Sequence, residues 1–517
     1  MTRAAKRLLP FSFFIFHFSF FGFAQSPFPN ANQRWVDSVF NSLTLDQKIG
    51  QLMMPRANFR NEPFEREKLL NWVQEYHVGG LVFFANQPTR TAQIINELQA
   101  ASSTPLLVGS DLEWGLTMRL DSTTRYPYRM GRQVGRQVRR LGIHVNYAPV
   151  VDVNNNPNNP VINFRSFGEN KQTVLRNALA YMRGMQDERV ITSAKHFPGH
   201  GDTDVDSHAD LPVIRHDRAR LDSLELYPFR ELIRQGLNGV MIAHLSIPAL
   251  DPTPNLPSTL SRPIVTDLLR NQLGFKGLIF TDAMEMQGVV KYFPNGEAAV
   301  RALQAGADLL ETFTDVPGTF NAIKYALAEG RLTQADINEK VRRILTAKAW
   351  TGLDQYRPAK IEGLLTDLNP GGADLLARDL TEDALTLLQN KDNRLPVREL
   401  SGKRFATLSL GSETRTAFQD MAAHYAPMDH FNLPAAAPDT LVQRVKTQLA
   451  GYDLVLVGIH GLGIRPASTM KPEVQALING FGSLPNAAFA LFGNPYTLNK
   501  FTELANAPAL IVAYQET

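Results

Sequence analysis

Short apolar runs alternate with longer amphipathic stretches between about residue 45 and residue 312. The runs are typical of strands that are buried on both faces of a parallel sheet. Eight runs are present: Gln51–Met54, Leu81–Phe84, Leu106–Gly109, His144–Tyr147, Ile191–Ala194, Val240–Ala243, Leu278–Thr281 and Asp308–Leu310. The intervening helical patterns include Arg132–Leu141, Thr173–Gln186, Leu221–Gln235 and Ser261–Leu273. Eight β-then-α units predict a (β/α)8 TIM-type barrel over residues 31–350, which the helical pattern Lys340–Ala349 closes.

A second α/β alternation follows the predicted barrel. Residues 351–375 contain prolines and glycines and predict a linker. Residues 376–517 then predict a doubly wound α/β sandwich domain. Its strand-like runs are Phe405–Leu410, Leu454–Gly458, Ala488–Phe492 and Ala509–Ala513. Because the chain stops at Thr517 without a closing helix, we expect this domain to be incomplete at its C-terminus.

The composition narrows the class of protein. The 517 residues are 44% hydrophobic and 20% charged, which excludes a disordered chain, a coiled coil and a polytopic membrane protein. There is no cysteine, so disulfides, thiol nucleophiles and thiolate metal sites are excluded as well.

The N-terminus predicts a secretory signal peptide over residues 1–24. Arg3, Lys6 and Arg7 precede an apolar run that ends in small residues near Ala24. An uncleaved anchor is the alternative, although the run is short for a membrane span. Without these three cations the basic and acidic residues balance, so the net charge of +3 gives no case for nucleic acid or anionic membranes. We expect an exported protein, periplasmic or extracellular.

Polar residues stand at the ends of the predicted barrel strands. Active sites of such barrels lie at the C-terminal ends of the strands, and a charge at that position does not help a core strand. The barrel mouth is therefore the predicted site. The polar residues at these ends are Asp111, Asp152, Lys195, His196, His244, Asp282 and Glu311.

The stretch from Lys195 to His208 is the most unusual in the chain, with three histidines and three aspartates in fourteen residues. It is typical of a catalytic loop, but a metal site and a polar loop capped by its own side chains remain alternatives. Its Pro-Gly-His-Gly sequence predicts a loop rather than a helix that pairs metal-binding histidines. Asp206 can orient His208 two residues later, and a histidine so paired can act as a general acid and base.

Asp282 follows the apolar run Leu278–Thr281 and offers a carboxylate at the barrel mouth. In covalent sugar chemistry it would be the nucleophile. The alternative is an aspartate that caps the following helix.

Four motifs together resemble glycoside hydrolase family 3, in its β-N-acetylglucosaminidase (β-N-acetylhexosaminidase) branch. The similarity runs from about Leu43 to the end of the chain. The family fold, a barrel followed by an α/β sandwich domain, agrees with the alternation. The motifs are Lys195–His208, Asp111–Gly115, Arg165–Gly168 and Phe280–Met284.

The resemblance implies a role for each matching residue. Asp282 corresponds to the nucleophile that forms a covalent glycosyl-enzyme, His208 to the acid/base and Asp206 to its partner. His200 and His244 stand in matching motifs with supporting roles. No metal and no other cofactor is implied. The residues that correspond to those gripping the hydroxyls of the terminal sugar are Asp111, Arg119, Arg165, Lys195 and His196.

The resemblance therefore implies a retaining exo-β-N-acetylglucosaminidase that acts on terminal N-acetylglucosamine (GlcNAc), with peptidoglycan fragments as substrates. A GlcNAc phosphorylase is an alternative, because a neutral imidazole repels an incoming phosphate less than a carboxylate does. A β-glucosidase of the same family and a non-catalytic sugar-binding protein are the others. Trp114 and Ala283 depart from the family pattern beside the site.

Overall fold

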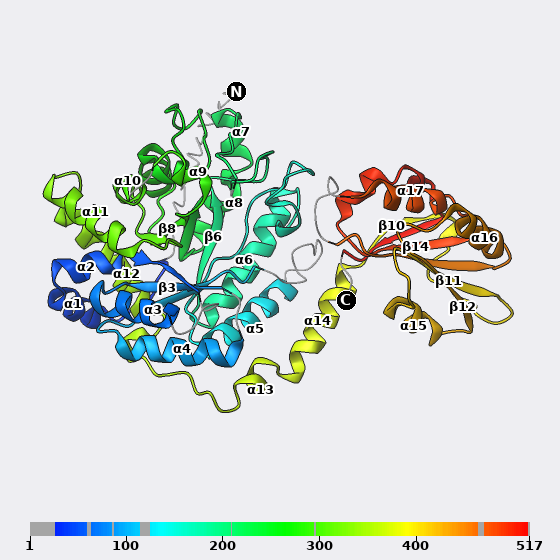
Figure 1. Ribbon diagram of the computed structural model, residues 1–517, viewed down its shortest axis with the longest axis horizontal. Coiled ribbons are helices and arrows are strands. Elements are labelled where there is room, and N and C mark those ends of the chain that lie inside the picture. Colours follow the sequence, from blue (N-terminus) through cyan, green and yellow to red (C-terminus); the bar gives the residue numbers. More distant parts are fainter. Residues whose placement is uncertain are drawn as a thin grey trace, which may run out of the picture.

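The computed structural model describes residues 26–58, 64–84, 87–113, 125–207, 209–293, 296–463 and 470–514. The predicted signal peptide, residues 1–24, lies outside them. The described chain forms a TIM-type barrel followed by a separate α/β sandwich domain (Figure 1).

The barrel sheet is entirely parallel and nearly closed. Pro55 lacks a backbone N–H and separates β1 from β2, so these short strands act as two halves of the first barrel strand. The first half pairs with β9 and the second with β3, which brings the sheet round on itself. In sheet order the strands are β1 (Met53–Met54), β9 (Leu309–Glu311), β8 (Leu278–Ala283), β7 (Gly239–Ile242), β6 (Ile191–Phe197), β5 (Val145–Asn146), β4 (Leu107–Ser110), β3 (Gly80–Phe83) and β2 (Arg56–Ala57).

Helices surround the barrel (Figure 1). The predicted pattern Leu221–Gln235 is two helices, because the chain leaves helical geometry at Leu224. The segment predicted as Ser261–Leu273 is a π-helix, Pro263–Gln272. The α-helices are α1 (Gln33–Ser42), α2 (Leu45–Gln51), α3 (Phe64–Glu75), α4 (Pro88–Ala101), α5 (Arg125–Leu141), α6 (Lys171–Asp187), α7 (Arg218–Ser223), α8 (Leu226–Arg234), α9 (Gln287–Val290), α10 (Glu297–Ala305), α11 (Val316–Ala328) and α12 (Gln334–Trp350).

The segment predicted as a linker, residues 351–375, contains a short helix, α13 (Leu364–Leu368), and the first turn of α14 (Gly371–Ala384). The apolar face of α14, Leu376, Leu380 and Ala384, packs into the barrel core. Helix α14 therefore belongs to the barrel by its packing and leads to the second domain (Figure 1).

The second domain has a six-stranded sheet with separate apolar clusters on its two faces, as expected when both faces are covered. The four predicted strands are present. Sequence reasoning missed β10, which pairs antiparallel with β15, and β12 at the edge, because both carry polar, half-exposed residues. In sheet order the strands are β10 (Thr386–Asn390), β15 (Ala509–Val512), β14 (Ala487–Leu491), β13 (Leu454–Ile459), β11 (Phe405–Leu410) and β12 (Met428–Leu433); the helices are α15 (Ala417–Ala423), α16 (Asp439–Leu449) and α17 (Pro472–Phe481).

The two domains meet at a polar contact beside the barrel mouth. The Asn494 side-chain amide donates to Asn163 Oδ1 at 2.6 Å, and both residues are buried. Asn154 Nδ2 donates to the Tyr496 hydroxyl at 2.9 Å. The second domain thus touches the loops that follow β5.

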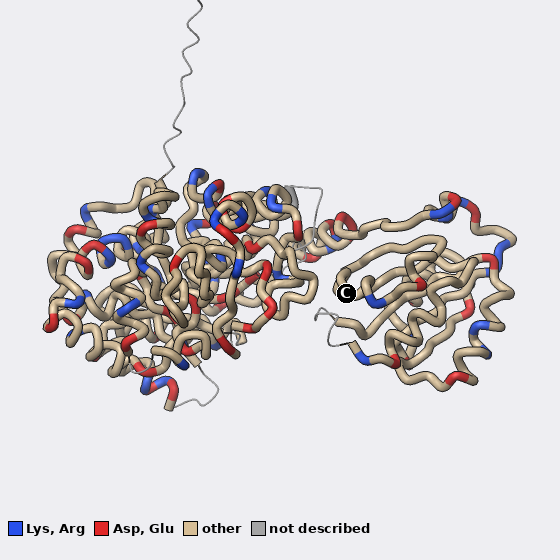
Figure 2. Tube along the Cα trace, turned by 90° about the horizontal axis from the view of Figure 1, so that it is seen from above, with Lys and Arg blue, Asp and Glu red and all other residues tan. Residues whose placement is uncertain are grey.

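Basic and acidic residues are interspersed over both domains (Figure 2). Within the described ranges, no helix combines the length and the apolar character that crossing a membrane requires.

Candidate active site

A pocket of about 770 Å³ opens at the C-terminal end of the barrel. Its wall comes from segments far apart in the sequence, which the barrel brings together at one face. Two predicted residues, Arg119 and His208, lie outside the described part of the chain. Of the other residues predicted for catalysis or sugar binding, Asp206 is not part of the pocket lining, and five line it: Asp111, Arg165, Lys195, His196 and Asp282.

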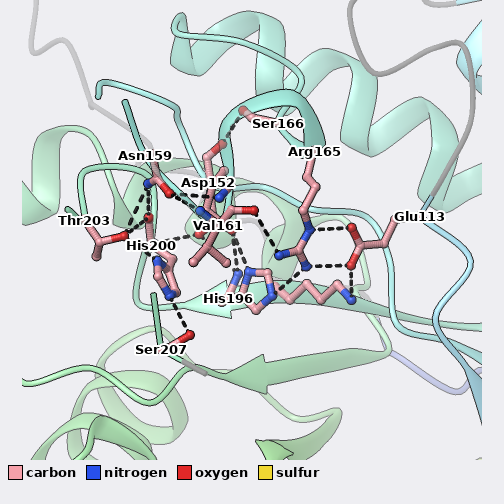
Figure 3. A network of polar contacts seen from close by, with 12 residues as sticks. Glu113, Asp152, Asn159, Val161, Arg165, Ser166, His196, His200, Thr203 and Ser207 are labelled. Atoms are coloured by element: carbon pink, nitrogen blue, oxygen red, sulfur yellow. Dashed lines mark hydrogen bonds and ion pairs between the residues drawn. The ribbon is translucent and has the colours of Figure 1, made fainter. Parts of the chain in front are cut away.

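Glu113 is the centre of a charged network along one wall of the pocket (Figure 3). Arg165 grips its carboxylate with two hydrogen bonds, from Nε at 2.8 Å and from a terminal nitrogen at 2.7 Å. Lys195 Nζ lies 2.5 Å from the same carboxylate and 2.6 Å from Asp111 Oδ1. The side chains of Arg165 and Lys195 are therefore preorganised by these ion pairs, and preorganised donors favour precise recognition of hydroxyl groups.

The network sets the charges of its members. Burial opposes ionisation of Glu113, but Arg165 and Lys195 outweigh it and hold the pKa of Glu113 well below its usual range. Burial likewise opposes the charge on Lys195, whereas Asp111 and Glu113 raise the pKa of Lys195 above its ordinary value. Both ions persist at neutral pH although they are nearly enclosed.

His196 is held in one tautomer. Its Nδ1 lies 2.7 Å from Asp152 Oδ2, and Arg165 lies 3.2 Å from its Nε2. A guanidinium only donates, so in the neutral ring Nε2 accepts and the proton resides on Nδ1, where it bonds the carboxylate. The ring therefore presents a fixed edge to the pocket.

Asp152 organises the strand end below the pocket. Its carboxylate accepts from the backbone N–H groups of His196, at 3.1 Å and 3.2 Å, and of His200, at 2.7 Å. Burial opposes its ionisation, but His196 and His200 lower the pKa of Asp152 overall. The sequence placed Asp152 at a strand end without giving it a role. The structure shows that it anchors both histidines.

The loop after β6 reaches the pocket through Ser207. His200 Nδ1 lies 2.8 Å from the Thr203 hydroxyl, and its Nε2 lies 3.2 Å from the Ser207 hydroxyl (Figure 3). Burial lowers the pKa of His200 to about 4, so the ring is neutral near pH 7. Ser207 is buried and lines the pocket, and Asp206 beside it is half-buried. His200 is thus a positioning residue that ties the loop to the barrel.

Asp282 is the second-to-last residue of β8 and lines the pocket. Its Oδ1 accepts from the Ala283 backbone N–H at 2.8 Å. Burial opposes ionisation, but His196 and His244 outweigh it and lower the pKa of Asp282 below its ordinary value. His244 packs behind it, with Nε2 3.0 Å from the Ala283 carbonyl oxygen. The carboxylate is thus charged and oriented, as a nucleophile must be. It does not cap a following helix, since α9 begins only at Gln287.

Within the described part of the chain, no group of three or more side chains that could hold a metal converges on one point; His208, the third histidine of the loop, lies outside it. The ring nitrogens of His196 and His200 contact Asp152, Arg165, Thr203 and Ser207 instead.

Comparison with known proteins agrees with the barrel and the pocket described above. Residues 44–347, more than half of the chain, match the glycosyl hydrolase family 3 N-terminal domain. The chain belongs to glycosyl hydrolase family 3. It is a glycoside hydrolase, and its barrel carries the matching region.

Several relatives of this family 3 chain are informative. Beta-hexosaminidase A of Pseudoalteromonas piscicida is 33% identical over 418 residues, which cover 69% of each protein. Beta-hexosaminidase LpqI of Mycobacterium tuberculosis is 36% identical over 305 residues, covering 53% of this chain and 77% of LpqI. The solved structure of a family 3 β-N-acetylglucosaminidase from a Paenibacillus strain has a TM-score of 0.75 at 30% identity, covering 92% of this chain and 94% of that one.

Proposed function

We propose that this family 3 chain is a retaining exo-β-N-acetylglucosaminidase that hydrolyses terminal, non-reducing β-linked GlcNAc. The observation that carries the proposal is the ionised Asp282 in a pocket that the Glu113–Arg165–Lys195 network also lines. The relatives named as hexosaminidases and the structural neighbour named as a β-N-acetylglucosaminidase support the choice of sugar.

In the first step Asp282 attacks the anomeric carbon of the bound sugar. A bond forms between the carboxylate oxygen and that carbon, while the glycosidic bond breaks and its electron pair goes to the leaving oxygen. His208 delivers a proton to that oxygen, with Asp206 as its partner. Support for this role comes from Ser207 between them, which is buried in the pocket wall.

In the second step a water molecule attacks the anomeric carbon of the glycosyl-enzyme. His208 accepts a proton from the water, and the ester bond to Asp282 breaks. Two displacements at one carbon retain the β configuration. Asp111, Arg119, Arg165, Lys195 and His196 hold the hydroxyls of the sugar throughout, so that the anomeric carbon stays in line with Asp282.

We further propose that the protein is exported to the periplasm or beyond the cell and that its substrates are peptidoglycan fragments. The basic and apolar N-terminal segment supports export. Peptidoglycan is a GlcNAc-containing polymer outside the cytoplasmic membrane, which gives an exported enzyme of this type a substrate.

The deciding experiment compares hydrolysis of an aryl β-GlcNAc and the matching aryl β-glucoside by the protein without residues 1–24. We expect a strong preference for the GlcNAc compound. A preference for the glucoside would contradict the choice of sugar and leave Asp282 as the nucleophile.

The nucleophile is tested separately with Asp282→Ala. The variant should lose roughly 10⁴-fold or more in kcat, because it lacks the attacking atom. Added azide should restore turnover and give a glycosyl azide of inverted configuration, since only one displacement remains. Turnover close to that of the wild type would contradict the covalent mechanism.

A further inference from the structure

Glu311 is a carboxyl group in the catalytic pocket to which neither the resemblance nor the proposed mechanism gives a role. It ends β9 and lines the same pocket as Asp282 and Lys195. Only 2% of the residue is exposed, so its carboxyl group has almost no access to bulk water.

Charged side chains surround Glu311 in the pocket wall. Asp111 and Asp282 both lie close enough to disfavour a negative charge on Glu311, while Lys195 favours it. Lys195 is already paired with Asp111 and Glu113. Burial, together with the two aspartates, raises the pKa of Glu311 well above its ordinary value.

The hydrogen bonds of Glu311 are incomplete. Its Oε1 is buried and has no hydrogen-bond partner among the described residues. The fully buried hydroxyl of Tyr147 lies near enough to lower the pKa of Glu311 in part, but it donates its hydrogen bond to Met54 Sδ at 4.0 Å. An unsatisfied buried polar atom has a cost, and in an enzyme pocket a ligand can supply the missing partner.

We propose that Glu311 is a further sugar-binding residue, whose protonated carboxyl group donates a hydrogen bond to a ring hydroxyl of the sugar in the pocket. This inference rests on the proposed function and adds a specific recognition contact to it. A neutral acid suits this position, because it donates to the sugar without adding a third negative charge beside the nucleophile.

Two substitutions of similar size separate this role from a structural one. Glu311→Gln keeps a neutral donor and acceptor, whereas Glu311→Met keeps the volume and removes both. We expect the Gln variant to stay within about threefold of the wild type in kcat/KM and the Met variant to lose about tenfold, with weaker binding of the free sugar by calorimetry. The proposal would be overturned if the kcat/KM of Glu311→Met matched that of the wild type. It would also be overturned if Glu311→Gln lost as much kcat/KM as Glu311→Met.

A spectroscopic measurement tests the same point without turnover. The wild type should show a protonated carboxylic acid C=O stretch in the infrared that shifts when sugar binds and disappears in Glu311→Gln. Asp308→Asn is the matched control, since Asp308 lies directly before β9 and is paired with arginines. That variant should keep the band. Absence of the band from the wild type would overturn the proposal.

The outcome does not depend on the choice of sugar. If the wild type prefers the aryl β-glucoside, the proposed function fails, and the Gln and Met variants are compared on that glycoside with the same expectation. If the wild type binds no sugar at all, both ideas fail together.

Discussion

Each end of the barrel carries an ion cluster built on one buried carboxylate. At the mouth, Glu113 is held by Arg165 and Lys195. At the opposite end, Asp308 is fully buried and held by Arg270 and by Arg343, whose Nε lies 2.8 Å from Asp308 Oδ1. In each cluster one buried carboxylate is paired with two cations.

The two clusters differ in how far their carboxylates are enclosed by protein hydrogen-bond donors. Asp308 also accepts from the Ile279 backbone N–H at 2.9 Å, so protein donors reach both of its oxygens. At the mouth, the Asp111 side chain that shares Lys195 is 39% exposed and faces an open pocket. Arg270 and Arg343 border a hollow at the surface, but Asp308 itself is enclosed by protein donors, so this cluster stabilises the fold. At the mouth, Asp111, Arg165 and Lys195 all line the pocket and hold their charges ready for a ligand. Substitutions at the two ends should therefore separate stability from activity.

The largest effect is expected from Asp308→Asn. Removing the carboxylate leaves two arginines close together without their shared anion, which should lower the free energy of unfolding by about 3–5 kcal/mol. Denaturant titration measures this loss. The kcat/KM of the folded fraction should stay within about twofold of the wild type, because the site is at the other end of the barrel. A large loss of kcat/KM in fully folded protein would contradict the comparison.

The same variant should change the response to acid. Burial opposes ionisation, but Arg270 and Arg343 outweigh it, so the pKa of folded Asp308 is below its ordinary value. The ion cluster therefore stabilises the fold at neutral pH, and this contribution is lost as the pH falls below about 4. Asp308→Asn should lose less stability than the wild type over that acid range.

Glu113→Gln should reduce activity more than it reduces stability. Without the anion between them, Arg165 and Lys195 lose their fixed positions, and kcat/KM should fall roughly 10²–10³-fold. The free energy of unfolding should fall less than in Asp308→Asn, since Lys195 keeps Asp111 and the pocket admits water. Steady-state kinetics and denaturant titration on both variants give the comparison. If both variants lost kcat/KM and free energy of unfolding in the same proportion, the contrast between the two ends of the barrel would be contradicted.

The smallest effect is expected from Lys340→Met, beside the Asp308 cluster. Lys340 is buried on α12 and has no hydrogen-bond or ion-pair partner in the described part of the chain. Burial lowers the pKa of Lys340 to about 8. Wild-type stability should therefore rise between about pH 8 and the ordinary lysine pKa near 10.4, because the unfolded chain binds more protons there.

The Met variant should lack that rise and be about 1 kcal/mol more stable than the wild type near pH 7. Thermal unfolding measured across this pH range tests both statements. A variant less stable at every pH would show that the Lys340 charge contributes favourably to this end of the barrel.

The sequence predicted most of the fold because barrel strands buried on both faces stand out as apolar runs. β11 was predicted at its observed bounds for the same reason. β12 was not predicted, because an edge strand such as Met428–Leu433 is half-exposed and carries polar side chains, so its composition is typical of a loop.

The candidate site was predicted from strand ends and motifs, and these locate residues without showing their partners. Glu113 lies inside the motif Asp111–Gly115 but was given no role, because Arg165, its partner, is 52 residues away in the chain. The pair of acids two residues apart, Asp111 and Glu113, was the signal that could have found it. The roles of Arg119 and His208 stay predictions.

The contact between the domains gives the second domain a mechanical connection to the pocket. Asn494 binds Asn163, two residues before Arg165, and Tyr496 binds Asn154, two residues after Asp152. A rotation of the second domain about α14 would therefore pull on the segment that presents the guanidinium to Glu113. Grafting a foreign second domain onto this barrel would therefore require partners that replace both Asn494 and Tyr496, even though the described pocket lies in the barrel.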